Sequence, residues 1–170
     1  MIFIARLDSI RQTLQIDIGF GDVIIPEPQA LSYPVLIRDL PAPDIFAYSL
    51  ETVLAEKFHA MIDLAESNSR YKDFYDVYKI LSQNELDEKN LKNAVHATFS
   101  NRNTNYIANH PIFSDDFVKD QNRNLLWNYF LKKIKYHDDL TFEMVMMLIK
   151  SNLQTVYESM ASDFLGLPRL

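Results

Sequence analysis

The stretch YSLETVLAEKFHAMIDLAESNSRYKDFYDVY, residues 48–78, decides the fold of the larger part of the chain. Its apolar residues recur at spacings of three and four, the pattern of helices with one buried face. The pattern predicts helices over residues 50–66 and 71–82. Ser49 is the predicted N-cap of the first helix, and Glu51 in the first turn suits the positive end of the helix dipole.

Lys57 interrupts the apolar face of the first predicted helix. A lysine in such a face either extends its ammonium out of the packed surface or presents it to an anion, because a buried unpaired charge is costly. The sequence leaves two interpretations open: a lysine that reaches solvent or an acidic residue of the next helix, and a phosphate-binding lysine. The positions three, four and seven residues away are all apolar: Leu50, Val53, Leu54, Ala60, Met61 and Leu64.

Two carboxylates follow in the second predicted helix. Asp73 and Asp76 are three residues apart and therefore lie on the same side of that helix, where they can share a cation or a basic partner. A purely structural interpretation is equally open. Acidic residues are favoured in a first helical turn, and Arg70 and Lys72 are close enough in sequence to pair with them.

The chain before residue 48 predicts strands. IFIARL (2–7) and TLQIDIGFGD (13–22) are two strands joined by a turn, and Leu14, Ile16 and Ile18 alternate with polar residues as in a strand with one buried face. Asp17 then points away from the apolar side. YPVLI (33–37) is a third, weaker strand. So small a sheet is marginal by itself in water, which predicts a further segment or a partner that covers it.

Further helices are predicted over residues 88–99, 115–135 and 141–161. The expected fold class is therefore α+β, with a β-rich unit of two or three strands over residues 1–48 and a helical region over residues 49–170. Basic and aromatic residues alternate from Lys119 to His137. That mixture suits RNA binding, and it suits an amphipathic core helix with a solvated face equally well.

Composition narrows the class of protein. The 170 residues contain no cysteine and carry a formal net charge of −6. The negative charge argues against nonspecific binding along a polynucleotide but is compatible with a local basic patch. A reducing, cytoplasmic setting is expected, and any metal must be held by oxygen or imidazole. The apolar run Met144 to Ile149 is far shorter than the ~20 residues of a membrane span.

Three blocks taken in order, IDIGFGDVIIPEP, YPVLIRDLPAP and residues 48–78, resemble the nucleotidyltransferase-like AbiEii/AbiGii toxin family over most of residues 1–83. The resemblance implies a partial sheet of the DNA polymerase β type and nucleotidyl transfer from an NTP, with GTP as a candidate, and with Mg²⁺. It implies that Lys57 binds a phosphate of the nucleotide and that Arg70 also contacts the nucleotide. Asp73 becomes the acidic residue of a later motif with Asp76 as companion, and Asp17 a carboxylate facing the metal.

The resemblance also has a gap. Members of the family carry a Gly-Gly/Ser turn and an Asp-x-Asp strand before the first block, and nothing before Asp17 fits either motif. We therefore expect the C-terminal portion of such a toxin, incomplete as an enzyme by itself. Expected partners are a nucleotide, a cognate antitoxin and a tRNA or protein acceptor. The alternative is a catalytically inactive remnant that binds a second copy or another protein through an exposed sheet edge.

Overall fold

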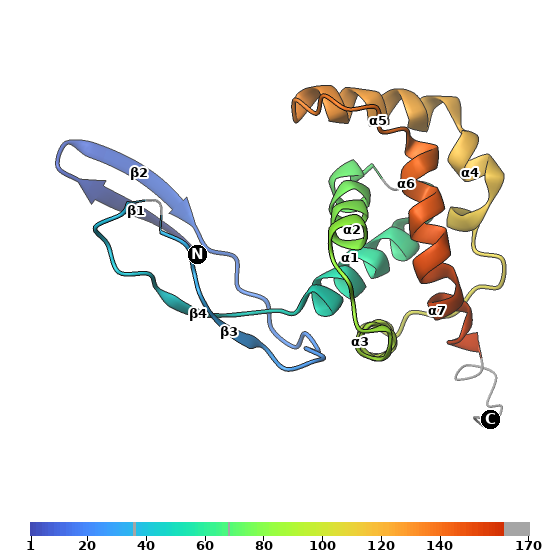
Figure 1. Ribbon diagram of the computed structural model, residues 1–170, viewed down its shortest axis with the longest axis horizontal. Coiled ribbons are helices and arrows are strands. Elements are labelled where there is room, and N and C mark those ends of the chain that lie inside the picture. Colours follow the sequence, from blue (N-terminus) through green and yellow to red (C-terminus); the bar gives the residue numbers. More distant parts are fainter. Residues whose placement is uncertain (36, 68, 162–170) are drawn as a thin grey trace.

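The computed structural model describes residues 1–35, 37–67 and 69–161, without the side chain of Glu66. Two strand hairpins lie at one end of the molecule, and a helical body lies at the other (Figure 1). The α+β class and the order of a β-rich beginning followed by a helical region are confirmed.

Each hairpin is a separate sheet within the described residues, so the single partial sheet expected from the sequence is not formed. β1 (Ile2–Leu7) pairs antiparallel with β2 (Ile10–Gln15), from Leu7↔Ile10 at the turn to Ile2↔Gln15 at the open end. β3 (Gln29–Ser32) pairs in the same sense with β4 (Asp44–Ala47).

The strand predicted over residues 13–22 is wrong in its second half. β2 ends at Gln15, and the pairing closes with two backbone hydrogen bonds between Met1 and Ile16, so the chain beyond has no neighbouring strand. The strand predicted over residues 33–37 is wrong at each described position. Pro34 has no N–H for a ladder, and strand pairing stops at the Tyr33 N–H, which donates to the Pro43 carbonyl.

The apolar side of the predicted hairpin is not buried. Leu14, Ile16 and Ile18 are 40, 49 and 55% exposed, and every residue of β1 to β4 is exposed or half-buried. The alternation of apolar and polar residues therefore marks a surface that no described part of the chain covers.

The first three helices match their predictions to within a few residues. α1 (Leu50–Leu64) contacts both α2 (Tyr71–Gln83) and α3 (Glu88–Asn101), and a short 3₁₀ turn, η1 (Ala65–Ser67), follows α1. Ser49 caps α1 as predicted, because its Oγ accepts a hydrogen bond from the Thr52 N–H at 3.2 Å.

Of the two later predicted helices, the first is divided in two, and the second is continuous but contains a π-helical segment. The span predicted as one helix over residues 115–135 is α4 (Asp115–Lys119) and α5 (Gln121–Lys133), because the Asp120 carboxylate accepts the Arg123 N–H at 2.6 Å and caps a new helix. The 3₁₀ turn η2 (Pro111–Phe113) precedes α4. The last span contains α6 (Phe142–Ile149), the π-helical η3 (Lys150–Gln154) and α7 (Thr155–Glu158).

An aromatic core holds the helical body together. Phe74 and Phe142 stack edge to face with ring centroids 5.3 Å apart, and Phe58 lies 5.7 Å from Phe99. Trp127 of α5 is fully buried and donates its indole N–H to the Leu140 carbonyl at 2.8 Å. α5 thus contributes Trp127 and Leu131 to the core, whereas its Leu125, Leu126 and Tyr129 are exposed. Within the described residues, no helix has both the length and the apolar character of a membrane span.

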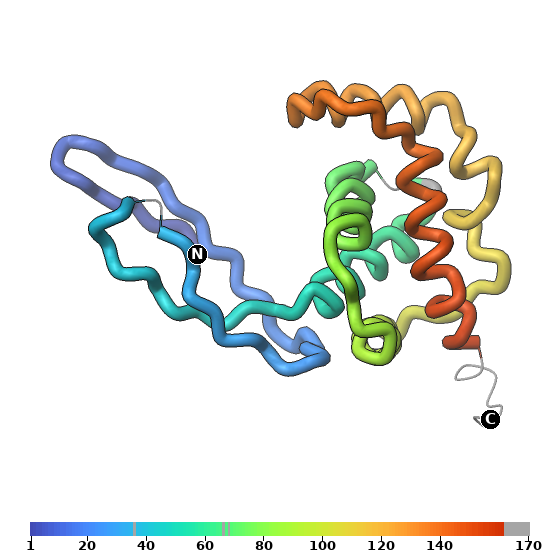
Figure 2. Tube along the Cα trace, viewed as in Figure 1, coloured from blue at the N-terminus to red at the C-terminus, as the bar shows by residue number. Residues whose placement is uncertain are grey.

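The loop after β2 reaches back to the helical body (Figure 2). Asn101 of α3 donates to the Gly21 carbonyl at 2.9 Å, and the Thr52 hydroxyl of α1 donates to the Ile25 carbonyl at 2.7 Å. Gly21 has a φ of +83°, a conformation that favours glycine, so this glycine marks a turn. Polar contacts therefore link the loop to α1 and α3.

Candidate functional site

Lys57 of α1 reaches across to α2 and contacts both predicted carboxylates. Its Nζ lies 3.0 Å from Asp73 Oδ1 and 2.6 Å from Asp76 Oδ2. The Asp73 side chain is 7% exposed, whereas those of Lys57 and Asp76 are 23 and 22% exposed. The spacing of three residues in α2 thus brings two acceptors to one ammonium, and the pairing with the next helix is confirmed.

Two further cations complete the group, which we call the Lys57 cluster: Lys57, Arg70, Lys72, Asp73 and Asp76. Arg70 Nε lies 3.0 Å from Asp73 Oδ2, and Lys72 Nζ lies 2.5 Å from Asp76 Oδ2. Each carboxylate therefore faces two cations. With three positive and two negative groups, the cluster carries a net positive charge in a protein whose formal net charge is −6.

The protonation states of the cluster follow from these contacts. Burial by itself would lower the pKa of Lys57, but the hydrogen bonds and charges of Asp76 and Asp73 outweigh burial and raise that pKa above its ordinary 10.5. Burial would likewise raise the pKa of Asp76, and the hydrogen bonds from Lys57 and Lys72 outweigh it and lower the pKa below 3.8. Lys57 is therefore an ammonium at neutral pH and does not serve as a general base.

The Lys57 ammonium has capacity for one more acceptor. An ammonium carries three N–H donors, and the two carboxylates of the cluster accept two of them. Because almost a quarter of the side chain is exposed, the third donor can meet a ligand at the surface. A phosphate oxygen there would accept a charge-assisted hydrogen bond from a cation that the protein already holds in position.

The cluster does not fit Mg²⁺. That ion takes oxygen ligands in near-ideal octahedral geometry, and both oxygens of Asp73 and the Oδ2 atom of Asp76 already face ammonium or guanidinium groups. Within the described ranges, no group of three or more His, Asp or Glu side chains is arranged to hold a metal. Asp17 lies exposed after β2 and accepts a hydrogen bond from Gln15 Nε2 at 2.7 Å.

Two features of the structure were not predicted from the sequence. Lys133 and Phe130 of α5 line a cavity together with Arg70 and Asp73, about 60 residues away in sequence. The basic end of α5 was visible in the sequence, but its position over α2 depends on tertiary packing. A second ion pair joins Arg102 of α3 to Glu56 of α1, with Asp22 of the loop 3.9 Å from the same guanidinium.

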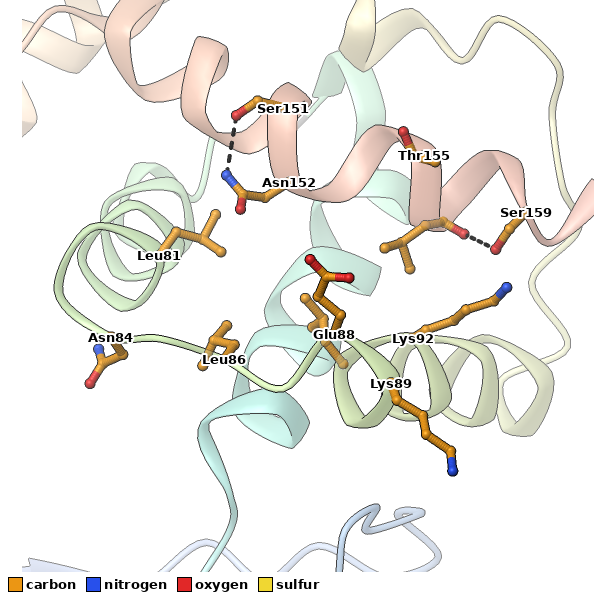
Figure 3. A pocket seen from close by; sticks show the side chains of 12 residues that line it. Leu81, Asn84, Leu86, Glu88, Lys89, Lys92, Ser151, Asn152, Thr155 and Ser159 are labelled. Carbon is orange, nitrogen blue, oxygen red and sulfur yellow. Dashed lines mark hydrogen bonds between the residues drawn. The ribbon is translucent and has the colours of Figure 1, made fainter.

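A larger groove of about 650 Å³ lies at the other end of α2, where the loop after α2, α3 and the last helical segments meet (Figure 3). Its apolar floor includes Leu81 and Leu86, and its rim carries Glu88, Lys89 and Lys92. None of the residues predicted to act on a nucleotide lines this groove. We therefore place the candidate site at the Lys57 cluster, although the groove is the larger of the two.

The fold and the cluster define an α+β protein with a lysine-centred group of charged side chains that carries a net positive charge. A comparison with family models matches residues 2–158 to the model described as "Nucleotidyl transferase AbiEii toxin, Type IV TA system". The chain belongs to this family. Searches of curated proteins and of solved structures returned no match.

Lys57→Met should destabilise the protein by roughly 1–3 kcal/mol, because it leaves the carboxylate of Asp73 buried with one partner fewer. The matched control is Lys72→Met. Lys72 also pairs with Asp76, but its side chain is 74% exposed, and we expect a change below about 0.5 kcal/mol. Urea unfolding followed by Trp127 fluorescence measures both, and equal losses would contradict the arrangement described above.

Proposed function

We propose that the Lys57 cluster binds the phosphates of a nucleoside triphosphate in a nucleotidyltransferase-type toxin component. The observation that carries this proposal is the Lys57 ammonium, which two carboxylates fix in place while one N–H donor stays unused by them. Membership of the AbiEii family supports a nucleotide as substrate and a toxin–antitoxin context.

Each residue of the cluster has a role in the proposal. Lys57 contacts a phosphate oxygen and stabilises negative charge as the nucleotidyl group is transferred, and Arg70 adds a second cation beside it. Asp73 and Asp76 are positioning residues that hold the ammonium and keep it charged. Because each carboxylate of the cluster is paired with two cations, we assign phosphate binding to the cluster and derive no metal-dependent step.

The finer parts of the function stay predictions. GTP as the preferred nucleotide, Mg²⁺ as cofactor, a cognate antitoxin as partner, a tRNA or protein acceptor and a cytoplasmic location extend the family assignment. Asp17 stays the predicted metal-facing carboxylate. If it faces a nucleotide-bound Mg²⁺, Asp17→Asn will reduce the gain in nucleotide affinity that Mg²⁺ provides.

A second candidate function is a protein-interaction module, and the exposed hairpins favour it. Apolar side chains are exposed to solvent on both β1–β2 and β3–β4, among them Leu7 (75% exposed), Ile10 (62%) and Phe46 (80%). Contiguous exposed apolar surface marks interaction sites, and unpaired strand edges can pair with another chain. A second copy or an antitoxin would then cover the hairpins.

Isothermal titration of GTP, ATP, CTP and UTP, with and without Mg²⁺, tests the nucleotide site. At least one nucleotide should bind, and Lys57→Ala should weaken it roughly tenfold to a hundredfold, the loss of one charged hydrogen bond. Lys89→Ala is the control, because it removes the same charge from the rim of the distant groove. Binding that is absent, or unaffected by Lys57→Ala, would contradict the proposal.

Light scattering over a concentration series tests the interaction module. If the hairpins mediate self-association, the average molar mass should rise from that of one chain towards that of two as the concentration increases, because the apolar hairpins of two copies bury each other. Leu7→Lys should shift this rise to higher concentration, since it introduces a charge into the exposed apolar surface of β1–β2. A single-chain mass at all concentrations would contradict self-association through the hairpins.

A further inference from the structure

A cavity of about 440 Å³ opens between the N-terminal end of α2 and the C-terminal end of α5; we call it the α2–α5 cavity. Figure 1 shows these two helix ends close together, with α5 across the end of α2. Arg70, the N-cap residue of α2, and Lys72 of α2 line it on one side, and Lys133 lines it from α5. Phe130 and Ile134 supply apolar lining.

The charge of this cavity is opposite to that of the protein as a whole. Three cationic side chains converge on it from two helices, whereas the chain has 23 acidic and 17 basic residues. Two of the three cations are paired, because Arg70 faces Asp73 of the lining and Lys72 faces Asp76. Lys133 is exposed and forms no ion pair among the described residues. The cavity therefore has an excess of positive charge.

The backbone of α2 adds to this excess. α2 is 13 residues long, and its N-cap residue, Arg70, provides no side-chain capping hydrogen bond for the first turn. The positive end of the helix dipole therefore faces the same region as the three cations. The cations of two separate helices are the main observation, and the helix end only reinforces them.

We propose that the α2–α5 cavity is a phosphate subsite formed by Arg70, Lys72 and Lys133. It adjoins the Lys57 cluster through Asp73, which contacts Lys57 and also lines the cavity. As an extension of the nucleotide site, the subsite rests on the proposed function. The ligand chemistry is a phosphate group, supplied either by the triphosphate of the nucleotide or by free inorganic phosphate.

The basic end of α5 provides a matched comparison. Lys132 and Lys133 are neighbours, both exposed and of the same charge, but Lys133 lines the cavity and Lys132 does not. A general attraction between a basic helix end and an anion would depend equally on both lysines. Of these two lysines, only Lys133 should contribute to a subsite formed by the cavity.

Titration with inorganic tripolyphosphate, which has neither base nor ribose, tests the subsite. The protein should bind it, Lys133→Ala should weaken binding roughly threefold to tenfold, and Lys132→Ala should leave it within about twofold. Lys133→Arg, which keeps the charge, should restore most of the affinity. No binding, or equal losses for Lys132→Ala and Lys133→Ala, would overturn the proposal.

Parallel titrations separate this inference from the proposed function. If nucleotides bind in a Lys57-dependent way and Lys133→Ala changes neither nucleotide nor tripolyphosphate affinity, the subsite is wrong and the nucleotide site stands. If tripolyphosphate binding depends on Lys133 and no nucleotide binds, the subsite stands and the nucleotide function is wrong.

A titration with orthophosphate distinguishes the two sources of the phosphate group. An affinity equal to that for tripolyphosphate identifies free phosphate as the ligand, and a much weaker affinity identifies the triphosphate of the nucleotide. Circular dichroism of each variant confirms that it is folded.

Discussion

The contact between the Lys57 ammonium and two carboxylates of α2 is the constraint on which the site depends. It allows a charged residue to sit in an apolar face of α1, where Leu54 and Met61 are fully buried. The lysine side chain is 23% exposed, and its ammonium meets Asp73 and Asp76 of α2. The same contact sets α1 against α2 and gives the protein a fixed positive charge at its surface.

An ion pair of this kind adds little net stability. Removing charges from water costs several kcal/mol per ion, and well-packed apolar residues of similar volume often stabilise a protein as much or more. The benefit of the cluster is therefore positional. Asp73 and Asp76 keep Lys57 charged and oriented, and under the proposed function a phosphate would meet a preorganised donor instead of a flexible surface lysine.

The sequence predicted the helical part of the site well because its signals are local. The apolar spacing around Lys57, the cap at Ser49 and the three-residue separation of Asp73 and Asp76 all act within one or two helical turns. The strands were harder to place. The end of β2 is set by its pairing with β1, which the sequence does not show. The alternation of apolar and polar residues shows which side of the strand is apolar, but it does not show what covers that side. The approach of Lys133 to α2 depends on tertiary packing for the same reason.

A lysine-selective NMR titration at pH 7 tests most directly whether Lys57 is the phosphate-binding group. The side-chain ¹⁵Nζ and ¹³Cε resonances of Lys57, assigned with Lys57→Arg, should shift as nucleotide is added, because the third N–H donor gains a phosphate acceptor. The resonances of Lys89, at the distant groove, should stay unchanged. A nucleotide that binds and leaves the Lys57 resonances unmoved would contradict the account.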